Sequence, residues 1–330
     1  MKYIKSFLIL TILLISNITI SYSQNNHDRP DYHAPITIMN DHSHKKGEFM
    51  TSYRYSEMKM SGLKNGSSAI TNSEALSNYM MIPKNMRMKM HMLGLMYGLT
   101  DKITLMMSGS IIDKEMQRVN SSNATSKANS KGYGDLKLGS IVNFYHKNNY
   151  ELLANASMSI PTGSINKQNQ DKKLPYSMQI GSGSYDMNLG FTHKIFYNKY
   201  SFGNQISGLF RLNNNDNGYK FGDQYNLNSW ASYKINNYSI SARVNYQKIE
   251  AIEGKDIDIT KMMIMMPTQD PALYKKEVVN FAIGTNYIFT KSNLKGNRLA
   301  IEIVKPLYQK FKGVQMKSDY KIVLGWQKLF

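Results

Sequence analysis

Thioether and basic side chains alternate in the stretch Met86–Met92, which reads MRMKMHM. A period of two places the four methionines on one face of a β-strand and the basic side chains on the other, whereas a helix would scatter both sets. Thioether sulfur binds soft ions such as Cu(I), and methionine also fills irregular apolar space. The stretch therefore predicts a strand with a methionine face, whose chemistry depends on the surrounding fold.

Imidazole and carboxylate side chains gather in a second stretch, HDRPDYHAPITIMNDHSHKKG, which begins at residue 27. Neutral imidazole together with carboxylate suits borderline metal ions such as Cu(II), Zn²⁺ or Ni²⁺. The candidate metal ligands are His27, His33, His42 and His44. The alternative is a solvated periplasmic segment that binds no metal.

The residues ahead of this stretch have the layout of a secretory signal. Lys2 and Lys5 precede an apolar run from about Phe7 to Ile18, and small residues follow at Ser21 and Ser23. The run is short for a membrane anchor. We therefore expect a cleaved signal peptide over residues 1–23, a His-rich periplasmic leader over 24–47 that is either disordered or plugging, and one further domain over 48–330.

Composition excludes several classes of site and partner. The chain has no cysteine, which excludes disulfides, thiolate metal sites and cysteine nucleophiles. The formal net charge is +18, but no compact Lys/Arg helix or aromatic and basic platform indicates nucleic-acid binding. A phosphate-rich membrane surface is the better partner for an exported basic chain.

Segments of about ten residues with alternating polarity repeat through the rest of the chain. In YSISARVNYQ (238–247), apolar positions such as Ile240 and Val244 alternate with polar ones such as Ser241 and Arg243. The pattern predicts antiparallel strands with one apolar and one hydrophilic face. A soluble sandwich shows the same alternation, so the connections must decide between the two.

Short and long connections alternate along the chain. Asn148-Asn149, Asn198-Lys199 and Asn236-Asn237 are expected to form tight hairpin turns, because Asn tolerates the positive φ that such turns require. Long polar loops lie between them, near 61–85, 114–131, 164–183, 213–221 and 251–276. This pattern is typical of bacterial outer-membrane barrels, and closure satisfies every backbone group in lipid. We predict an all-β fold, a transmembrane antiparallel β-barrel of about 12 strands in the cell outer membrane.

The last segment, DYKIVLGWQKLF (319–330), alternates in the same way and ends on an aromatic residue. It resembles the terminal strand that the barrel-assembly machinery recognises in outer-membrane proteins. We therefore expect that machinery as a partner and Phe330 as part of the signal. The alternative is an ordinary edge strand.

The alternation also assigns side chains to the lumen. Leu93 and Leu95 should meet lipid, which leaves the methionine face toward the lumen and Arg87 and Lys89 near the phosphates of lipopolysaccharide. Three roles are open for the methionines: packing in a plugged lumen, a Cu(I) path, and a weakly polar path for apolar solutes. The expected lumen or substrate-path residues are Met58, Met60, Met86, Met88, Met90, Met92, Met96, Arg54 and Arg243.

Four pieces of the sequence resemble a known family: GYGDLKLG (132–139), SIPTGSI (159–165), LPYSMQIGSGSYD (174–186) and NDNGYKFGD (215–223). In this order they resemble the outer-membrane transporters grouped under the meta-pathway of phenol degradation. The resemblance implies a barrel of about twelve strands that passes small, largely apolar molecules across the outer membrane. The methionine abundance and the His-rich leader are not among that family's core motifs.

No catalytic constellation emerges from the sequence. Ser182 and Ser184 lack a nucleophile-elbow sequence, so no enzymatic activity is expected. We predict an outer-membrane channel or transporter for small, apolar or aromatic solutes, in contact with membrane lipid and lipopolysaccharide, and without a cofactor unless copper binds. The alternatives are copper or other soft-metal handling, through the Met-lined lumen and the His-rich leader, and a non-transporting structural or adhesive barrel.

Overall fold

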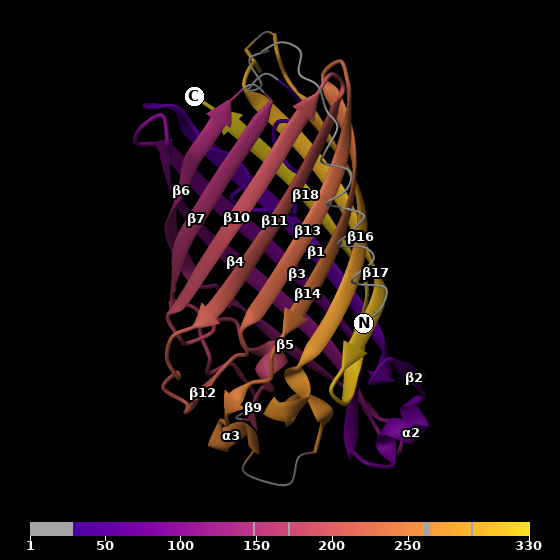
Figure 1. Cartoon of the computed structure of the whole chain (residues 1–330). Helices are drawn as coiled ribbons and strands as arrows, with labels where there is room; N and C mark the ends of the chain where they lie inside the picture. The colour runs from indigo at the N-terminus through magenta and orange to yellow at the C-terminus, as the bar shows by residue number, and fades with distance from the viewer. Residues whose placement is uncertain (1–28, 148, 171, 261–264, 292) are drawn as a thin grey trace.

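The computed structural model describes residues 29–330 except 148, 171, 261–264 and 292. In this part of the chain, twelve tilted antiparallel strands close into a barrel, because the last strand pairs with the first (Figure 1). The predicted all-β barrel is confirmed, whereas the predicted signal peptide lies outside the described residues. The barrel strands are β1 (Phe49–Asn65), β3 (Met81–Gly98), β4 (Ile103–Asn120), β6 (Leu136–Lys147), β7 (Tyr150–Ile160), β10 (Asp186–Tyr197), β11 (Tyr200–Arg211), β13 (Gln224–Ile235), β14 (Tyr238–Ile249), β16 (Lys276–Ile288), β17 (Asn297–Phe311) and β18 (Val314–Leu329).

Shorter elements belong to the connections. None of the described helices is long and apolar enough to cross a membrane. The strands among these elements are β2 (Ser68–Ile70), β5 (Thr125–Tyr133), β8 (Gln168–Asn169), β9 (Lys172–Lys173), β12 (Tyr219–Lys220) and β15 (Glu253–Gly254). The helices are α2 (Asn72–Leu76) and α3 (Ile257–Thr260), with 3₁₀ turns η2 (Tyr176–Met178), η3 (Pro267–Gln269) and η4 (Pro271–Tyr274).

The two ends of the barrel differ in their connections (Figure 1). At the short-turn end, Asn198 and Asn236 adopt φ of 51° and 54°, which confirms two of the three predicted hairpin turns. In the third, Asn148 lies outside the described residues. The long-loop end carries α2, α3 and the other short elements. One connection there differs from the predicted alternation, because only residues 312–313 join β17 to β18. These two strands are 15 and 16 residues long. They continue as a paired hairpin into the region where the alternation predicts a long loop.

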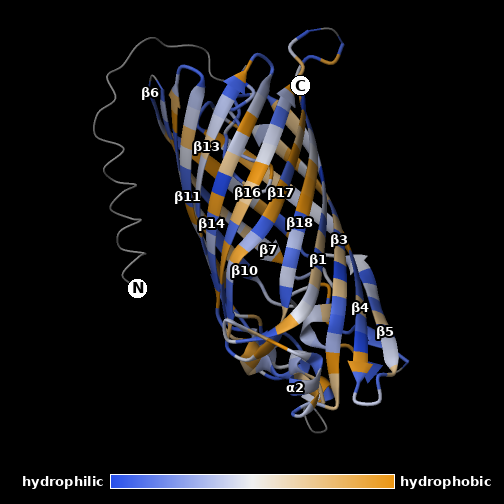
Figure 2. Ribbon diagram, turned by 90° about the vertical axis from the view of Figure 1, so that its right-hand side faces the viewer, coloured by the Kyte–Doolittle hydropathy of each residue, from blue (hydrophilic) through white to orange (hydrophobic). Residues whose placement is uncertain are grey.

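Hydrophobic and hydrophilic residues alternate along the strands (Figure 2), which gives the barrel a largely apolar outer wall and a largely polar inner wall. Large apolar side chains such as Leu93, Ile206 and Ile283 are exposed on the outside, while Ser52 and Asn155 are buried inside. Aromatic side chains form part of a girdle at the short-turn end, as outer-membrane barrels require at the membrane interface. Its ring pairs include Phe49–Phe330, Tyr200–Tyr233 and Tyr238–Tyr287, with centroids 6.1, 5.0 and 4.5 Å apart.

The long loops pack against one another over the long-loop end. One apolar cluster joins Leu63, Met116 and Met316 of the barrel strands to Leu174 and Met178 of the loops. A second cluster packs Tyr176 against Tyr219, with ring centroids 4.8 Å apart, and includes Ile252 and Ile259. These contacts bury apolar surface that would otherwise face water, so the loops form a cap rather than loose tethers.

Candidate functional site

A cavity of about 400 Å³ lies in the lumen. Its lining residues come from β1, β7, β10, β11, β13, β14, β16, β17 and β18, and residues 37–40 close it toward the short-turn end. Cavities of roughly this size, about 300–1,000 Å³, accept small molecules. The lumen therefore has room for a small solute.

One wall of this lumen cavity consists of neutral amides. Each of six neighbouring strands, β7, β10, β11, β13, β14 and β16, contributes one or two amide side chains to it. Asn280 Nδ2 donates to Asn245 Oδ1 at 3.0 Å, and Gln247 Nε2 donates to Asn226 Oδ1 at 3.1 Å. Each amide both donates and accepts hydrogen bonds without carrying charge. The amide wall comprises Asn155, Asn188, Gln205, Asn226, Asn228, Asn245, Gln247 and Asn280.

The other wall combines apolar side chains, Met58 and Met60 on β1, Val278 on β16 and Val304 on β17, with the basic side chains of Lys276 and Lys321. Of the residues predicted for the solute path, Met58, Met60 and Arg243 line the cavity. Thioether and aliphatic groups contact apolar surfaces with little geometric demand. The cavity therefore offers a hydrogen-bonding side and an apolar side to the same solute.

The remaining predicted path residues are absent from the lining of the cavity. Met88 and Met92 stand opposite Met58 and Arg54 in the register of β1 and β3, but they do not line the cavity, and neither do Met90 and Met96. Arg54 is buried, with 8% of its surface exposed.

Met86 is also separated from the cavity. It is buried in the apolar cluster under the loop cap, beside Met116 and Met316. The alternation of MRMKMHM correctly predicts a strand, but only the folded loops decide that its first methionine is sealed in a core.

The positive charge of Arg243 is neutralised inside the lumen by Glu302. Its Nε donates to Glu302 Oε1 at 2.7 Å and its Nη1 donates to Asn228 Oδ1 at 2.9 Å. The side chains of Arg243 and Glu302 are 3% and 1% exposed. A buried pair of this kind adds no net charge, so Arg243 does not make the cavity an anion filter.

Residues 29–47, the inner segment, enter the barrel at its short-turn end. Most residues up to His44 are buried, whereas Lys45 to Gly47 are exposed. Arg29 Nη1 donates to the carbonyl of Asn198 in the β10–β11 turn at 2.8 Å. Residues 37–40 form the tip of the segment. There the Thr37 amide donates to Glu302 Oε2 at 2.9 Å, and Gln205 Nε2 donates to the Met39 carbonyl at 2.8 Å. Because Glu302 and Gln205 belong to strands four steps apart in the barrel, the tip is bonded to different sides of the wall.

A buried ion pair fixes the first limb of the inner segment. Lys194 Nζ lies 2.7 Å from Glu151 Oε2, and both side chains are almost fully buried. Tyr32 joins this pair, because its hydroxyl donates to Glu151 Oε1 at 3.1 Å and its carbonyl accepts from Lys194 Nζ at 3.1 Å. The Lys194 ammonium also lies 4.2 Å from the centre of the Tyr32 ring, within cation–π range.

Three of the four predicted metal-binding histidines meet inside this segment. The ring centroids of His33 and His42 are 3.9 Å apart, and those of His42 and His44 are 5.1 Å apart. Desolvation by burial lowers the pKa of His33 well below its usual value and that of His42 to about 4. Both imidazoles are therefore neutral at pH 7. His27 lies outside the described residues.

The sequence pieces that resemble a known family converge at the long-loop end. Asp135 accepts hydrogen bonds from the amides of Gly163 and Ser182 at 2.9 and 2.8 Å, and from the Ser182 hydroxyl at 2.8 Å. Asn215 Nδ2 donates to the Ser182 carbonyl at 3.1 Å. Gly163 and Gly181 are in close contact, since a Cβ on Gly181 would lie 2.1 Å from the Gly163 carbonyl oxygen. These pieces thus fix the loops, and both the amide and the hydroxyl of Ser182 belong to this network.

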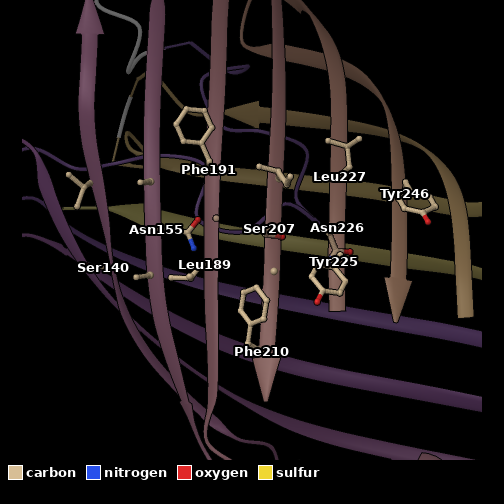
Figure 3. Close-up of a pocket in the computed structure, with 16 residues that line it drawn as sticks. Ser140, Asn155, Leu189, Phe191, Ser207, Phe210, Tyr225, Asn226, Leu227 and Tyr246 are labelled. Carbon is tan, nitrogen blue, oxygen red and sulfur yellow. The ribbon is translucent and has the colours of Figure 1, made fainter. Parts of the chain in front are cut away.

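A wider groove of about 760 Å³ lies on the outer surface of the same wall (Figure 3). It is bordered by apolar side chains such as Leu189, Phe191 and Phe210 and floored by Ala154 and Ala156. The strand ladders under it, from β7 through β10 and β11 to β13, carry no register shift. The groove therefore faces the membrane, and Asn155, Ser207 and Asn226 line both the groove and the lumen cavity.

Comparisons with known proteins agree with this architecture. No curated protein matches the chain. Among solved structures, the COG4313 outer membrane channel from Pseudomonas putida F1 is 16% identical, with a TM-score of 0.62 over 94% of this chain and 100% of that one. The transport unit of the autotransporter AIDA-I from Escherichia coli is 10% identical, with a TM-score of 0.48 over 89% of this chain and 93% of that one.

The match to the channel shows that this chain has the fold of an outer-membrane barrel. The family model described as "Putative MetA-pathway of phenol degradation" matches residues 104–293, more than half of the sequence. The region includes all four of the sequence pieces that converge at the long-loop end. The chain therefore belongs to this family and is an outer-membrane β-barrel protein.

Proposed function

We propose that this barrel is a channel for small, largely apolar solutes that carry at least one hydrogen-bonding group. The observation that carries the proposal is the lumen cavity, in which the amide wall faces Met58, Met60, Val278 and Val304. An aromatic ring with a hydroxyl substituent is a solute of this class. It would place its ring against the apolar side and its polar group against the amides.

The balance of interactions suits passage rather than retention. Conduction requires binding that is favourable enough for a solute to enter and weak enough for it to leave. Neutral amides supply many equivalent, modest hydrogen bonds, and Lys276 and Lys321 on the other wall favour a solute whose polar group accepts hydrogen bonds. The family's description and the fold shared with an outer membrane channel support the same conclusion. The proposal assigns no catalytic step to the protein.

The inner segment is the gate in this proposal. It lies between the lumen cavity and the short-turn end, which faces the periplasm in outer-membrane barrels. A solute that crosses the membrane must pass this segment, so the segment shifts or withdraws during transport. Its hydrogen bonds to the wall set how often that happens.

The outer surface near the long-loop end is proposed to contact lipopolysaccharide. Arg87 and Lys89 project outward on β3, and Arg87 forms a two-point ion pair with Glu57 at 2.8 and 2.9 Å. Basic side chains at this level attract the phosphates of the outer leaflet. The terminal strand β18 is in turn proposed as the part that the barrel-assembly machinery recognises.

Uptake in cells with a porin-poor outer membrane tests the channel. Ser207→Trp puts a large ring into the cavity from β11, whereas Ile206→Trp puts the same ring on the lipid side of the same strand. We expect the Ser207 variant to lose most uptake of small hydroxylated aromatic solutes and the Ile206 variant to keep it. Equal uptake by both variants at equal outer-membrane levels would refute this route.

A further inference from the structure

Three imidazoles in the inner segment have ring nitrogens with no hydrogen-bond partner. These buried atoms are His33 Nδ1, His42 Nε2 and His44 Nε2. His42 and His44 are 2% and 4% exposed, so water does not satisfy them easily. Burying a polar atom without a partner costs about 1–3 kcal/mol. Three such nitrogen atoms in neighbouring rings point to a binding site for a metal cation, which would accept their lone pairs.

The carboxylate of Asp41 orients the His42 imidazole. His42 Nδ1 lies 2.9 Å from Asp41 Oδ1, and Asp41 Oδ2 accepts the Ala34 amide at 2.6 Å. A carboxylate bound to one nitrogen of an imidazole fixes its proton there and leaves the other nitrogen as a lone pair. This carboxylate–histidine arrangement typically orients histidine ligands at metal sites.

The donor atoms are close enough to share one ion. His33, Asp41 and His42 each offer a ligand atom, and these atoms lie within 4.8 Å of one another. The ring of His44 is adjacent to that of His42. This group does not include His44, so the His44 imidazole must turn toward the other two before three ring nitrogens can reach the roughly 2.0–2.1 Å that zinc requires.

We propose that the inner segment binds one divalent transition-metal ion of borderline softness, such as Zn²⁺, Ni²⁺ or Cu²⁺, through His33, His42 and His44. Asp41 is a positioning residue in this site. Imidazole ligands favour these ions over Mg²⁺ and Ca²⁺, which prefer oxygen, and over Cu(I), for which thioethers are the better ligands.

The surroundings supply access to the site and limit its affinity. His33 and His44 line a cavity of about 720 Å³ at the short-turn end, together with Lys45 and Thr290, so an ion reaches the site from that side. Lys194 and Arg298 are near enough to act electrostatically on His33. Glu151 neutralises Lys194 at 2.7 Å. We therefore expect weaker binding than at a closed site with four protein ligands.

The bound ion would fasten the inner segment in place. His33 lies before the tip at residues 37–40, and His42 and His44 lie after it. An ion that they share therefore links the two limbs and opposes withdrawal of the segment. This consequence for transport rests on the proposed channel function, whereas the binding itself does not.

Titration of the purified protein with ZnCl₂ or NiCl₂ in a calorimeter tests the site. We expect one ion per chain, and His33→Gln, His42→Gln and His44→Gln together should abolish this binding. The matched control replaces the three histidines of the barrel strands, His91, His146 and His193, and should bind as the parent does. Loss of binding in this control, or binding retained in the inner-segment variant, would overturn the proposal. A His27→Gln variant must bind as the parent does, or the site lies elsewhere.

Two further measurements separate a ligand site from a fold defect. Asp41→Asn keeps every proposed ligand, so a decrease in affinity of about 10–100-fold is expected, and an unchanged affinity would remove Asp41 from the site. In the parent protein, Cu²⁺ should show nitrogen hyperfine structure in electron paramagnetic resonance, and the triple inner-segment variant should lose it. Heat-modified mobility on gels confirms that each variant is a folded barrel.

Hydrogen exchange of residues 29–47 tests the fastening without reference to transport. Zn²⁺ should slow amide exchange in this segment of the parent and leave exchange in the triple variant unchanged. Ion binding with no added protection would refute the link between the two limbs. If Zn²⁺ slows amide exchange as expected but the protein takes up no solute, only the proposed channel function is refuted.

Discussion

Loss of Glu151 should release the inner segment from the barrel. In the folded protein the Glu151 carboxylate neutralises Lys194 and accepts hydrogen bonds from Tyr32 and from Asn143 Nδ2. Glu151→Gln keeps the shape of the side chain but leaves the ammonium group unpaired while the segment covers it. Removing one partner of a buried ion pair costs about 3–5 kcal/mol. When the segment withdraws, water enters the lumen and hydrates Lys194. The free-energy cost of the unpaired ammonium therefore applies only while the inner segment lies inside the barrel, which we call the seated state.

The expected magnitude follows from that difference. At about 1.4 kcal/mol for each factor of ten, the ratio of seated to withdrawn segment should fall roughly a hundred- to several-thousand-fold. The native chain has no cysteine, so a single thiol reports this equilibrium cleanly. Ile38→Cys places it at the tip, where the parent side chain is 3% exposed and packs near Trp230. With a chelator present, labelling by a membrane-impermeant maleimide should be slow in the parent background and much faster after Glu151→Gln.

The double variant Glu151→Gln with Lys194→Met provides the control. It removes both charges, so no unpaired ammonium remains, and replacing a whole buried pair by neutral groups costs far less than breaking it. Labelling should return close to the parent rate. If Glu151→Gln leaves labelling unchanged, or if the double variant labels as fast as the single one, the pair does not hold the segment and this reasoning is wrong.

Three further predictions concern assembly and packing. Replacing Met86, Met88, Met90 and Met92 together with Leu should leave outer-membrane levels and uptake of small aromatic solutes nearly unchanged, because such swaps cost less than about 1.5 kcal/mol each; loss of copper tolerance at normal levels would instead favour a Cu(I) path. Deleting Phe330 removes the backbone bonds that join it to Phe49, at 2.8 and 3.4 Å, so fractionation should find less protein in the outer membrane, and normal levels would contradict this role. Gly181→Ala forces a Cβ against the Gly163 carbonyl and should lower stability by about 1–3 kcal/mol in denaturant titrations, whereas Gly109→Ala, with its nearest neighbour at 3.9 Å, should not.

Much of the barrel could be predicted from the sequence because its signals are local. The side-chain direction in a strand repeats every two residues, so MRMKMHM and YSISARVNYQ each indicate their own faces without knowledge of any partner. The turns at Asn198 and Asn236 are likewise set by the φ that Asn tolerates. The connection at residues 312–313 was missed, because a two-residue turn between long strands has no distinct composition.

The two chemical sites had signals of different quality. The leader histidines are conspicuous in the sequence as candidate ligands, and their role as metal ligands stays a prediction. Their sequence spacing does not reveal that His33 and His42 are in contact. The amide wall was missed, although its members are visible as polar positions in six strands. Asparagine and glutamine are common in polar strand faces and in loops alike, so only the closed barrel shows that eight of them face one cavity.

The sequence by itself determined the strands, their faces, the tight turns and the aromatic end of the chain, since each depends on neighbours a few residues away. Only the tertiary structure decided that residues 29–44 lie inside the barrel and that Met86 is buried under the loops. The contacts that hold the inner segment join residues far apart in the chain, as Tyr32 and Glu151 or Thr37 and Glu302 do. Such contacts have no period in the sequence, because they depend on closure of the sheet, which brings distant strands around one lumen.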